Sequence, residues 1–341
     1  MASRKRRRPD TQSSVHADRS APLWALAWTP AGGLEEIATV NELKEAYAQP
    51  DSRIWVDTED ADRDVLLAIA GCFQLHPLIT DDILERNQRA KVEEIDNNIH
   101  VVMFALHDEG DRIAHHEIDI VLGERFLFTA HDPAVKPREA PFMRRTQGVH
   151  LEKGVDYLLW AICDWLVDDY FPVFDFIGEQ IDEMEDEVTG SAPVPVAERL
   201  FSLRKDLLTI RRAVNPVREV FNQLTNRDLP YIPAERVLYF RDIYDHLIRL
   251  TDELDSYRDL VSSTHDIYLS QVNNNLSEVM KRLTAVTAVL ATIGAVGGIF
   301  GMSEAGPALD FQENLGFWAV TAAALILAGL VFYLFRKRGW V

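Results

Sequence analysis

Two long apolar runs near the end of the chain dominate its hydrophobic pattern. Residues 283–300 and 317–335 contain no charged side chain. At about 1.5 Å of rise per helical residue, each run is long enough to cross the hydrocarbon layer of a bilayer. Lys281 and Arg282 precede the first run, basic residues follow the second, and no Lys or Arg lies between the runs. The positive-inside rule therefore predicts two membrane spans with both chain ends in the cytoplasm.

A long helical segment leads into the first apolar run. No Gly or Pro occurs between Pro233 and Gly294, which predicts one helix with Pro233 at its first position. Apolar side chains recur in it with alternating spacings of four and three residues, the a/d seam of a helix that packs against partner helices. The seam residues are Ile243, Leu247, Leu250, Leu254, Tyr257 and Val261, and the phase continues through Thr264 and Tyr268.

A stripe of small or polar residues follows the seam after a drift of one position. Its members are Ser277, Met280, Thr284, Thr287, Ala291, Gly294 and Gly298. Small residues at a spacing of four are typical of tight helix packing in lipid. The other interpretation is a pore wall of hydroxyls and backbone around an axis of self-association, narrowed at Met280 or Leu283. Both interpretations remain open from the residues alone.

The first half of the chain mixes strand and helix patterns. Strand-like runs cover residues 53–56, 100–104, 117–122 and 125–129, and helical patterns cover residues 61–70 and 77–86. This mixture predicts an α/β domain over residues 21–150. An acidic helical stretch, 155–187, and a basic one, 196–226, then predict an antiparallel helix pair with Pro172 and Pro216 as kinks or breaks.

The composition narrows the function classes. The formal net charge of −19 argues against nucleic acid as a partner, although residues 1–20 form a basic tail that we expect to be disordered. Cys72 and Cys163 are the only cysteines. This usage fits a reducing compartment, argues against a disulfide scaffold, and suggests that oxygen atoms hold any metal.

No catalytic motif emerges, so we expect neither an enzyme nor a small organic substrate. The chain has no Gly-rich phosphate loop, no G-x-S-x-G and no H-E-x-x-H. His115 and His116 lie at the start of a strand-like run without a third ligand at a recognisable spacing. We interpret them as ordinary strand residues rather than as a zinc site.

Several short motifs occur along the chain from residue 76 to residue 302. They are HPL at 76–78, DIL at 82–84, YFRDIYDH at 239–246, RDLVS at 258–262, DIYLS at 266–270, EVMK at 278–281, and Gly301 with Met302. With these motifs the chain resembles the CorA family of magnesium and cobalt transport proteins. The resemblance implies a homopentamer embedded in a lipid bilayer. Its α/β cytoplasmic funnel and long α-helical stalk lead into two C-terminal transmembrane helices. In this chain the resemblance implies the following regions after the α/β domain: antiparallel helices at 151–232, a stalk helix at 233–282, a pore-lining span at 283–303, an outer loop at 304–316, a second span at 317–335 and a basic tail at 336–341.

The resemblance also implies roles for single residues. The family's pore positions correspond here to Ser277, Met280, Thr284, Ala291, Gly294, Gly301 and Met302. Asp82 and Asp242 match positions where the family bridges neighbouring subunits with a regulatory Mg²⁺. The family's Gly-Met-Asn motif at the pore mouth has Ser303 in place of Asn, and a hydroxyl is shorter than a carboxamide. Acidic residues that could form a ring at the mouth are Glu304, Asp310 and Glu313.

These observations predict a divalent cation channel gated by cytoplasmic Mg²⁺. Mg²⁺ would be both transported and regulatory, and Co²⁺ or Ni²⁺ could also pass. The change at Ser303 leaves two alternatives open: a Zn²⁺ transporter of the same family, and a non-conducting membrane metal sensor.

Overall fold

Seven strands form a single mixed sheet in the first half of the chain. The computed structural model describes residues 22–60, 62–110, 112–146, 149–189, 196–302 and 315–340. The strand order is β2-β1-β3-β7-β6-β5-β4, and every neighbouring pair is antiparallel except β3 with β7. The strands are β1 (Pro22–Thr29), β2 (Gly33–Thr39), β3 (Arg53–Glu59), β4 (Lys91–Ile95), β5 (Asn98–Asp108), β6 (Ile113–Leu122) and β7 (Phe126–His131).

The four strand-like runs of the sequence are confirmed: three lie within β3, β5 and β6, and the fourth, 125–129, begins one residue before β7. Burial explains why these four were visible. Every described position of β7 is buried, as are the first nine of β5, and strands buried on both faces are nearly continuous apolar runs. Strands β1, β2 and β4 were not predicted, and in β4 and β2 most side chains are exposed or only half-buried.

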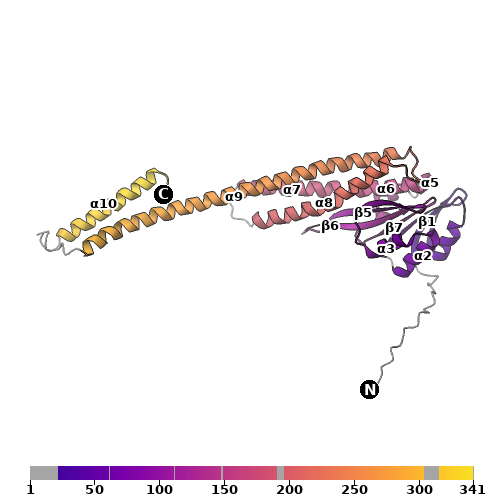
Figure 1. The fold of residues 1–341 in the computed structure, drawn as a ribbon, viewed down its shortest axis with the longest axis horizontal. Coiled ribbons are helices and arrows are strands. Elements are labelled where there is room, and N and C mark those ends of the chain that lie inside the picture. The colour runs from indigo at the N-terminus through magenta and orange to yellow at the C-terminus, as the bar shows by residue number, and fades with distance from the viewer. Residues whose placement is uncertain are drawn as a thin grey trace, which may run out of the picture. The chain divides into compact units, whose positions relative to one another are not determined.

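Three short helices cover one face of the sheet, with α2 and α3 on one side of it in Figure 1. Leu43, Ile69 and Ile79 of these helices belong to one buried apolar cluster with strand residues such as Val56 and Phe128. Such burial stabilises the domain by about 25 cal/mol for each Å² of apolar surface removed from water. The three helices are α1 (Val40–Tyr47), α2 (Arg63–Phe73) and α3 (Pro77–Glu85).

The next helices connect the sheet to the helical part of the chain. Helix α6 contacts β3, β5, β6 and β7, and α8 contacts β4, β5 and β6. In Figure 1, α6 lies on the side of the sheet opposite α2 and α3, so the domain has three layers. These elements are η1 (Pro137–Glu139), α4 (Pro141–Thr146), α5 (Val149–Lys153), α6 (Val155–Asp168), α7 (Tyr170–Thr189) and α8 (Val196–Asn226).

The two prolines were predicted to mark kinks or breaks, and a break is confirmed at Pro172. Helix α6 ends at Asp168 and Pro172 lies in the first turn of α7, where a missing N–H removes no helical hydrogen bond, so the chain does break there. Pro216 lies inside α8, which continues to Asn226. Pro216 is therefore not a break.

The long helix is confirmed as one continuous element, α9 (Val237–Met302). It begins four residues later than predicted, because Pro233 belongs to the preceding turn, in which its carbonyl accepts the N–H of Arg236 at 2.8 Å. The last helix is α10 (Leu315–Lys337).

The partners of the apolar seam on α9 are helices of the same chain. Ile243, Leu247 and Leu250 are fully buried. A Cβ atom on Gly178 of α7 would lie 2.7 Å from the hydroxyl oxygen of Tyr257, so α7 and α9 approach closely at this glycine. The sequence left open whether the helices that pack on this seam belong to the same chain or to other copies. Helices of the same chain bury it.

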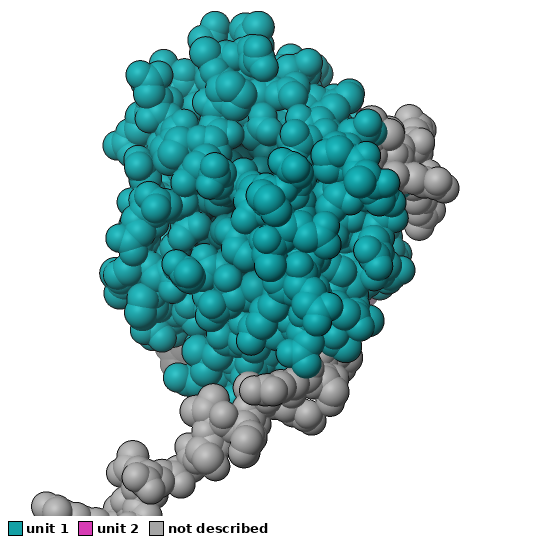
Figure 2. All heavy atoms as spheres, turned by 90° about the vertical axis from the view of Figure 1, so that its right-hand side faces the viewer, with its two compact units in different colours: residues 1–185, 194–261 teal, residues 186–193, 262–341 magenta. Residues whose placement is uncertain are grey.

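The chain divides into two compact units. Unit 1 comprises residues 1–185 and 194–261, and unit 2 comprises residues 186–193 and 262–341. Figure 2 shows unit 1 as closely packed heavy atoms. Both cysteines are free, as predicted, and Cys163 is buried. The predicted basic tail, residues 1–20, lies outside the described residues.

Candidate metal-binding and pore-lining site

Asp82, one of the two residues with an implied regulatory role, lies on α3. The helix begins after His76, whose Nδ1 accepts a hydrogen bond from the N–H of Leu78 at 3.1 Å. Pro77 occupies its first turn, a position that suits proline. The helix ends at Glu85, and the next residue, Arg86, has a left-handed φ of 45° and donates its N–H to the carbonyl of Asp82. Local hydrogen bonds therefore fix both ends of α3, the helix that carries Asp82.

The carboxylate of Asp82 has a cationic partner within its own chain. Lys91 Nζ lies 2.7 Å from Asp82 Oδ2 and 2.8 Å from Glu93 Oε2. Burial alone lowers the pKa of Lys91, but hydrogen bonds and the charges of Asp82 and Glu93 outweigh burial and raise that pKa. Lys91 is therefore charged at neutral pH and neutralises part of the negative charge around Asp82.

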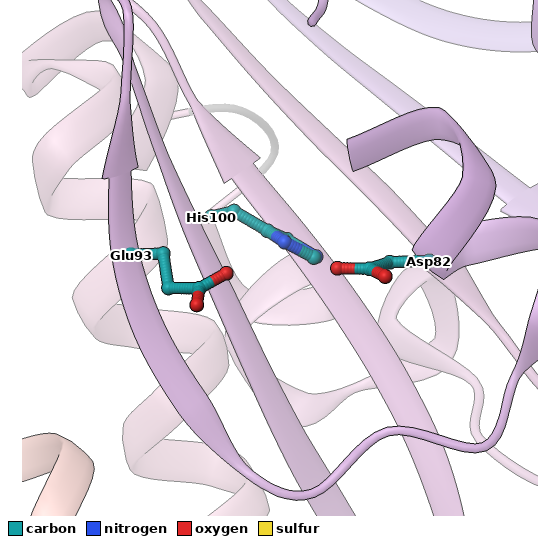
Figure 3. Close-up of side chains that lie close together, drawn as sticks. All are labelled: Asp82, Glu93 and His100. Carbon is teal, nitrogen blue, oxygen red and sulfur yellow. The ribbon is translucent and has the colours of Figure 1, made fainter. Parts of the chain in front are cut away.

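Asp82 also belongs to a group of three potential metal ligands. Ligand atoms of Asp82, Glu93 and His100 lie within 4.8 Å of one another, and among the described residues this is the only group of three or more such side chains. Figure 3 shows the three side chains converging from α3, β4 and β5. Of the three, only Asp82 was predicted as a site residue from the sequence.

Asp242, the second residue with an implied regulatory role, is exposed near the start of α9. It lies near two acidic residues of α6. Burial, followed by the charges of Asp168 and Asp242, raises the pKa of Asp164 to about 6, while His246 opposes this effect. Burial also raises the pKa of Asp168; its Oδ1 lies 3.8 Å from His246 Nδ1, which opposes the effect. A divalent cation would stabilise the charged forms of these carboxylates.

Asp82 and Asp242 do not meet within one chain. No hydrogen bond or ion pair in the described part of the structure joins them. Asp164 and Asp168, which surround Asp242, were missed by the sequence analysis. Their spacing of four residues, which places both on one face of a mostly apolar helix, was the available signal.

The pore-stripe residues of α9 share an uncovered face. All seven members from Ser277 to Gly298 are exposed in the single chain. The hydroxyls of Thr284 and Thr287 donate to the carbonyls of Met280 and Leu283, at 2.7 and 2.8 Å. Because each hydroxyl hydrogen is used inside the helix, the oxygen lone pairs remain as outward-facing acceptors.

A different face of α9 is covered within unit 2. Ala285 is only 2% exposed, and four further residues on its side are half-buried. These four are Ala288, Val289, Thr292 and Val296. At 3.6 residues per turn, this covered face points away from the stripe by roughly 140°. Helix α10 is the other helix of this unit, and its Ala328 is also buried.

The stripe also differs from its uncovered neighbours in side-chain size. From Thr284 to Gly298 it contains only Thr, Ala and Gly, and a Cβ on Gly294 or Gly298 would meet no atom within 4 Å. On an adjacent exposed face lie Val286, Leu290 and Ile293, which are 56%, 63% and 41% exposed. The helix thus presents a bulky apolar face and a small hydroxyl-bearing face side by side.

The predicted pore mouth begins at the end of α9. Gly301 and Met302 close α9. The remaining mouth residues lie outside the described residues; they are Ser303, Glu304, Asp310 and Glu313. Their roles stay predictions.

His115 and His116 make separate contacts on β6. Adjacent strand residues point to opposite faces of a sheet. The ring of His115 packs edge-on against Phe104 at 5.1 Å, whereas His116 lies 3.7 Å from Glu109 and 3.6 Å from Asp132. The two histidines do not share a site.

One helix among the described residues is long and apolar enough to cross a membrane. It spans residues 237–298, and its most apolar 18-residue window has a mean hydropathy of 1.5 and is 6% buried. This window differs from the core helix of a soluble protein, which is mostly buried.

Comparison with known families decides the relationship. Residues 51–337 match the family described as CorA-like Mg²⁺ transporter protein. The chain belongs to the CorA family. Members of this family are ion transporters and not enzymes. The cobalt/magnesium transport protein CorA of Thermotoga maritima is 32% identical to this chain over 293 residues, which cover 84% of this chain and 83% of that protein.

A second relative extends the match to structure. The cobalt/magnesium transport protein CorA of Methanocaldococcus jannaschii is 25% identical over 292 residues, or 84% of this chain and 91% of that protein. The complete structure of the CorA magnesium transporter from this organism superposes with a TM-score of 0.76 at 23% identity. The superposition covers 93% of this chain and 98% of that one. The predicted architecture, an α/β domain followed by a long helix with a membrane-competent end, is confirmed as the CorA fold.

Proposed function

We propose that this chain assembles into a homopentamer that conducts Mg²⁺, and also Co²⁺ or Ni²⁺, across the cell membrane. The observation that carries the proposal is the uncovered stripe of α9. Small residues and hydroxyl oxygens face away from the covered side of the helix, where copies around an axis would enclose them. Mg²⁺ gives up its waters reluctantly, so a path lined by small residues and oxygen acceptors suits a hydrated ion.

The remaining membrane topology belongs to the same proposal. Helix α10 contains no charged residue from Leu315 to Phe335 and ends at Arg336 and Lys337, which supports a second span. Lys281 and Arg282 flank the first span on the corresponding side. With both chain ends in the cytoplasm, unit 1 would contact the cytoplasmic pool of the transported ion.

The proposed regulation uses the acidic residues of unit 1. Mg²⁺ would bind between Asp242 of one subunit and Asp82 of its neighbour, with Asp164 and Asp168 adding negative charge beside Asp242. The raised pKa values of these two residues support a site that gains from a bound cation. Abundant cytoplasmic Mg²⁺ would then hold the subunits together and close the pore.

Flux measurements on the purified full-length protein in liposomes test conduction. Pentamers verified by light scattering should admit Mg²⁺ and Co²⁺ down a membrane potential. Folded pentamers that pass none of Mg²⁺, Co²⁺, Ni²⁺ or Zn²⁺ would overturn the proposal and favour a non-conducting sensor. Flux of Zn²⁺ alone would favour the zinc-transport alternative.

The regulatory part has its own test. Asp242→Asn should weaken the inhibition of flux by Mg²⁺ on the cytoplasmic side, whereas Asp252→Asn, at another exposed position of α9, should leave it unchanged. Equal inhibition of both variants would contradict a role for Asp242 without contradicting conduction.

A further inference from the structure

The potential ligands around Asp82 form a site whose geometry follows from the sheet. Glu93 of β4 and His100 of β5 are direct partners across the hairpin. Directly opposed residues of an antiparallel pair lie on the same face, and that face carries Ile95 and Val121, which pack with Ile79 and Ile83 of α3 in one cluster. Helix α3 therefore brings Asp82 over a Glu–His pair that the strand register has already formed (Figure 3).

His100 supplies the observation that points to a ligand. Its side chain is fully buried, and its Nε2 lies 2.8 Å from Asp119 Oδ1. The Nδ1 atom is buried without a hydrogen-bond partner. Because the carboxylate of Asp119 can only accept, Nε2 carries the hydrogen, and Nδ1 has a free lone pair when the ring is neutral. Metal-binding histidines are oriented in this way, with a carboxylate on the ring nitrogen that does not bind the metal.

Lys91 shows that the position already attracts a cation. Its ammonium group bridges Asp82 Oδ2 and Glu93 Oε2 at 2.7 and 2.8 Å. This bridge satisfies the two carboxylates but leaves Nδ1 of His100 unpaired, and an unsatisfied buried acceptor is unfavourable. A divalent metal ion would use all three groups, whereas the ammonium group uses only two.

We propose that Asp82, Glu93 and His100 bind a divalent transition-metal ion within one subunit, and that Lys91 leaves the two carboxylates when the metal enters. One imidazole nitrogen with two carboxylates favours Zn²⁺ or Co²⁺ over Mg²⁺, which prefers oxygen ligands alone. Asp119 positions the imidazole and does not touch the metal. This site is separate from the Mg²⁺ site proposed between subunits, although both use Asp82, and it does not depend on conduction.

Metal binding to the full-length protein in detergent tests the site, with an excess of Mg²⁺ present to occupy oxygen-only sites. Zn²⁺ affinity is measured by calorimetry, and Co²⁺ binding is followed by its visible absorption. Glu93→Gln should weaken Zn²⁺ binding by about tenfold or more, since even loss of an outer-shell partner of a metal ligand costs about 10–100-fold in affinity. Glu94→Gln removes the same charge from the opposite face of β4 and should change nothing.

Lys91→Met separates a metal site from a purely structural ion pair. If Lys91 competes with the metal, its removal should tighten Zn²⁺ binding by about tenfold, because one cation no longer has to be displaced. Asp82→Asn should weaken binding as Glu93→Gln does. Unchanged Zn²⁺ affinity in both Glu93→Gln and Lys91→Met would overturn the proposal and leave Lys91 as the only cation of this cluster.

Discussion

Helix α9 contains two stretches whose regularly spaced faces are covered in different ways. In unit 1 its apolar seam, represented by Leu247 and Leu250, is buried by other helices of the same chain. In unit 2 one face is covered around Ala285, but the stripe from Thr284 to Gly298 is uncovered. The first stretch is buried within a single chain, whereas in the assembly that we propose the second is covered by other copies. Regular spacing therefore identifies a contact face but not the partner that covers it.

The largest effect is expected from filling the stripe. Gly294→Leu places a side chain where a Cβ meets no atom of its own chain, so the single chain should fold. In the assembled pore the added side chains should narrow the path and reduce Mg²⁺ flux into liposomes at least about tenfold. Gly329→Leu on α10, where a Cβ also meets nothing, is the matched control and should conduct. Equal loss of flux in both variants would contradict the assignment of the ion path to the stripe of α9.

A core substitution in the seam should reduce stability rather than conduction. Leu250 is fully buried, and truncation of such a leucine costs about 2–5 kcal/mol through lost burial and a cavity. Leu250→Ala should therefore lower the urea midpoint of the full-length protein, followed by tryptophan fluorescence. Ile248→Ala, at a position that is 36% exposed, should cost less than about 1 kcal/mol. Similar costs at both positions would show that the seam is not the buried face.

The smallest effect is expected from a buried ion pair within unit 1, between His131 and Asp57. Burial lowers the pKa of His131, but a hydrogen bond and the charge of Asp57 outweigh it and raise that pKa. The Nε2 of His131 lies 3.1 Å from Asp57 Oδ1, and Arg138 Nε lies 2.9 Å from Asp57 Oδ2. Glu59 also acts on His131 by its charge. Because the folded state binds the proton more tightly, this stabilisation is complete below the unfolded pKa of about 6.5 and is lost as pH rises through the folded value.

Measurement of the unfolding free energy across this pH range checks the sign. The difference between the wild type and His131→Gln should be largest below pH of about 6.5 and should shrink as the pH rises. The change should be smaller than that of Leu250→Ala. A difference that grows with pH would contradict the assignment.

Prediction from the sequence was most accurate where a single periodicity or a single feature of the composition determines the structure. The continuity of α9 followed from the absence of Gly and Pro, and the strands β5 and β7 from their apolar runs. The predicted start of α9 was wrong, because proline suits a preceding turn as well as the first turn of a helix. The exposed strand β4 was missed because its side chains, KVEEI, give no apolar face of their own.

The candidate sites were predictable to different degrees. The stripe followed from helical spacing, but its uncovered state required the structure. Asp82 and Asp242 came from family resemblance, since an isolated Asp is normally a solvated surface residue. Glu93 and His100 were missed because their proximity depends on the register of β4 with β5, and a one-residue slip would place either side chain on the other face.

A cysteine scan of α9 tests most directly whether the uncovered stripe lines a shared aqueous path. Cys72 is replaced by Ser, Cys163 is buried and is retained, and single cysteines are introduced into the first span. Co²⁺ flux is then measured before and after a water-soluble thiol reagent. We predict block at stripe positions 284, 287, 291, 294 and 298, and no block at covered positions 285, 288, 289, 292 and 296. Block at the covered positions with none along the stripe would contradict the account.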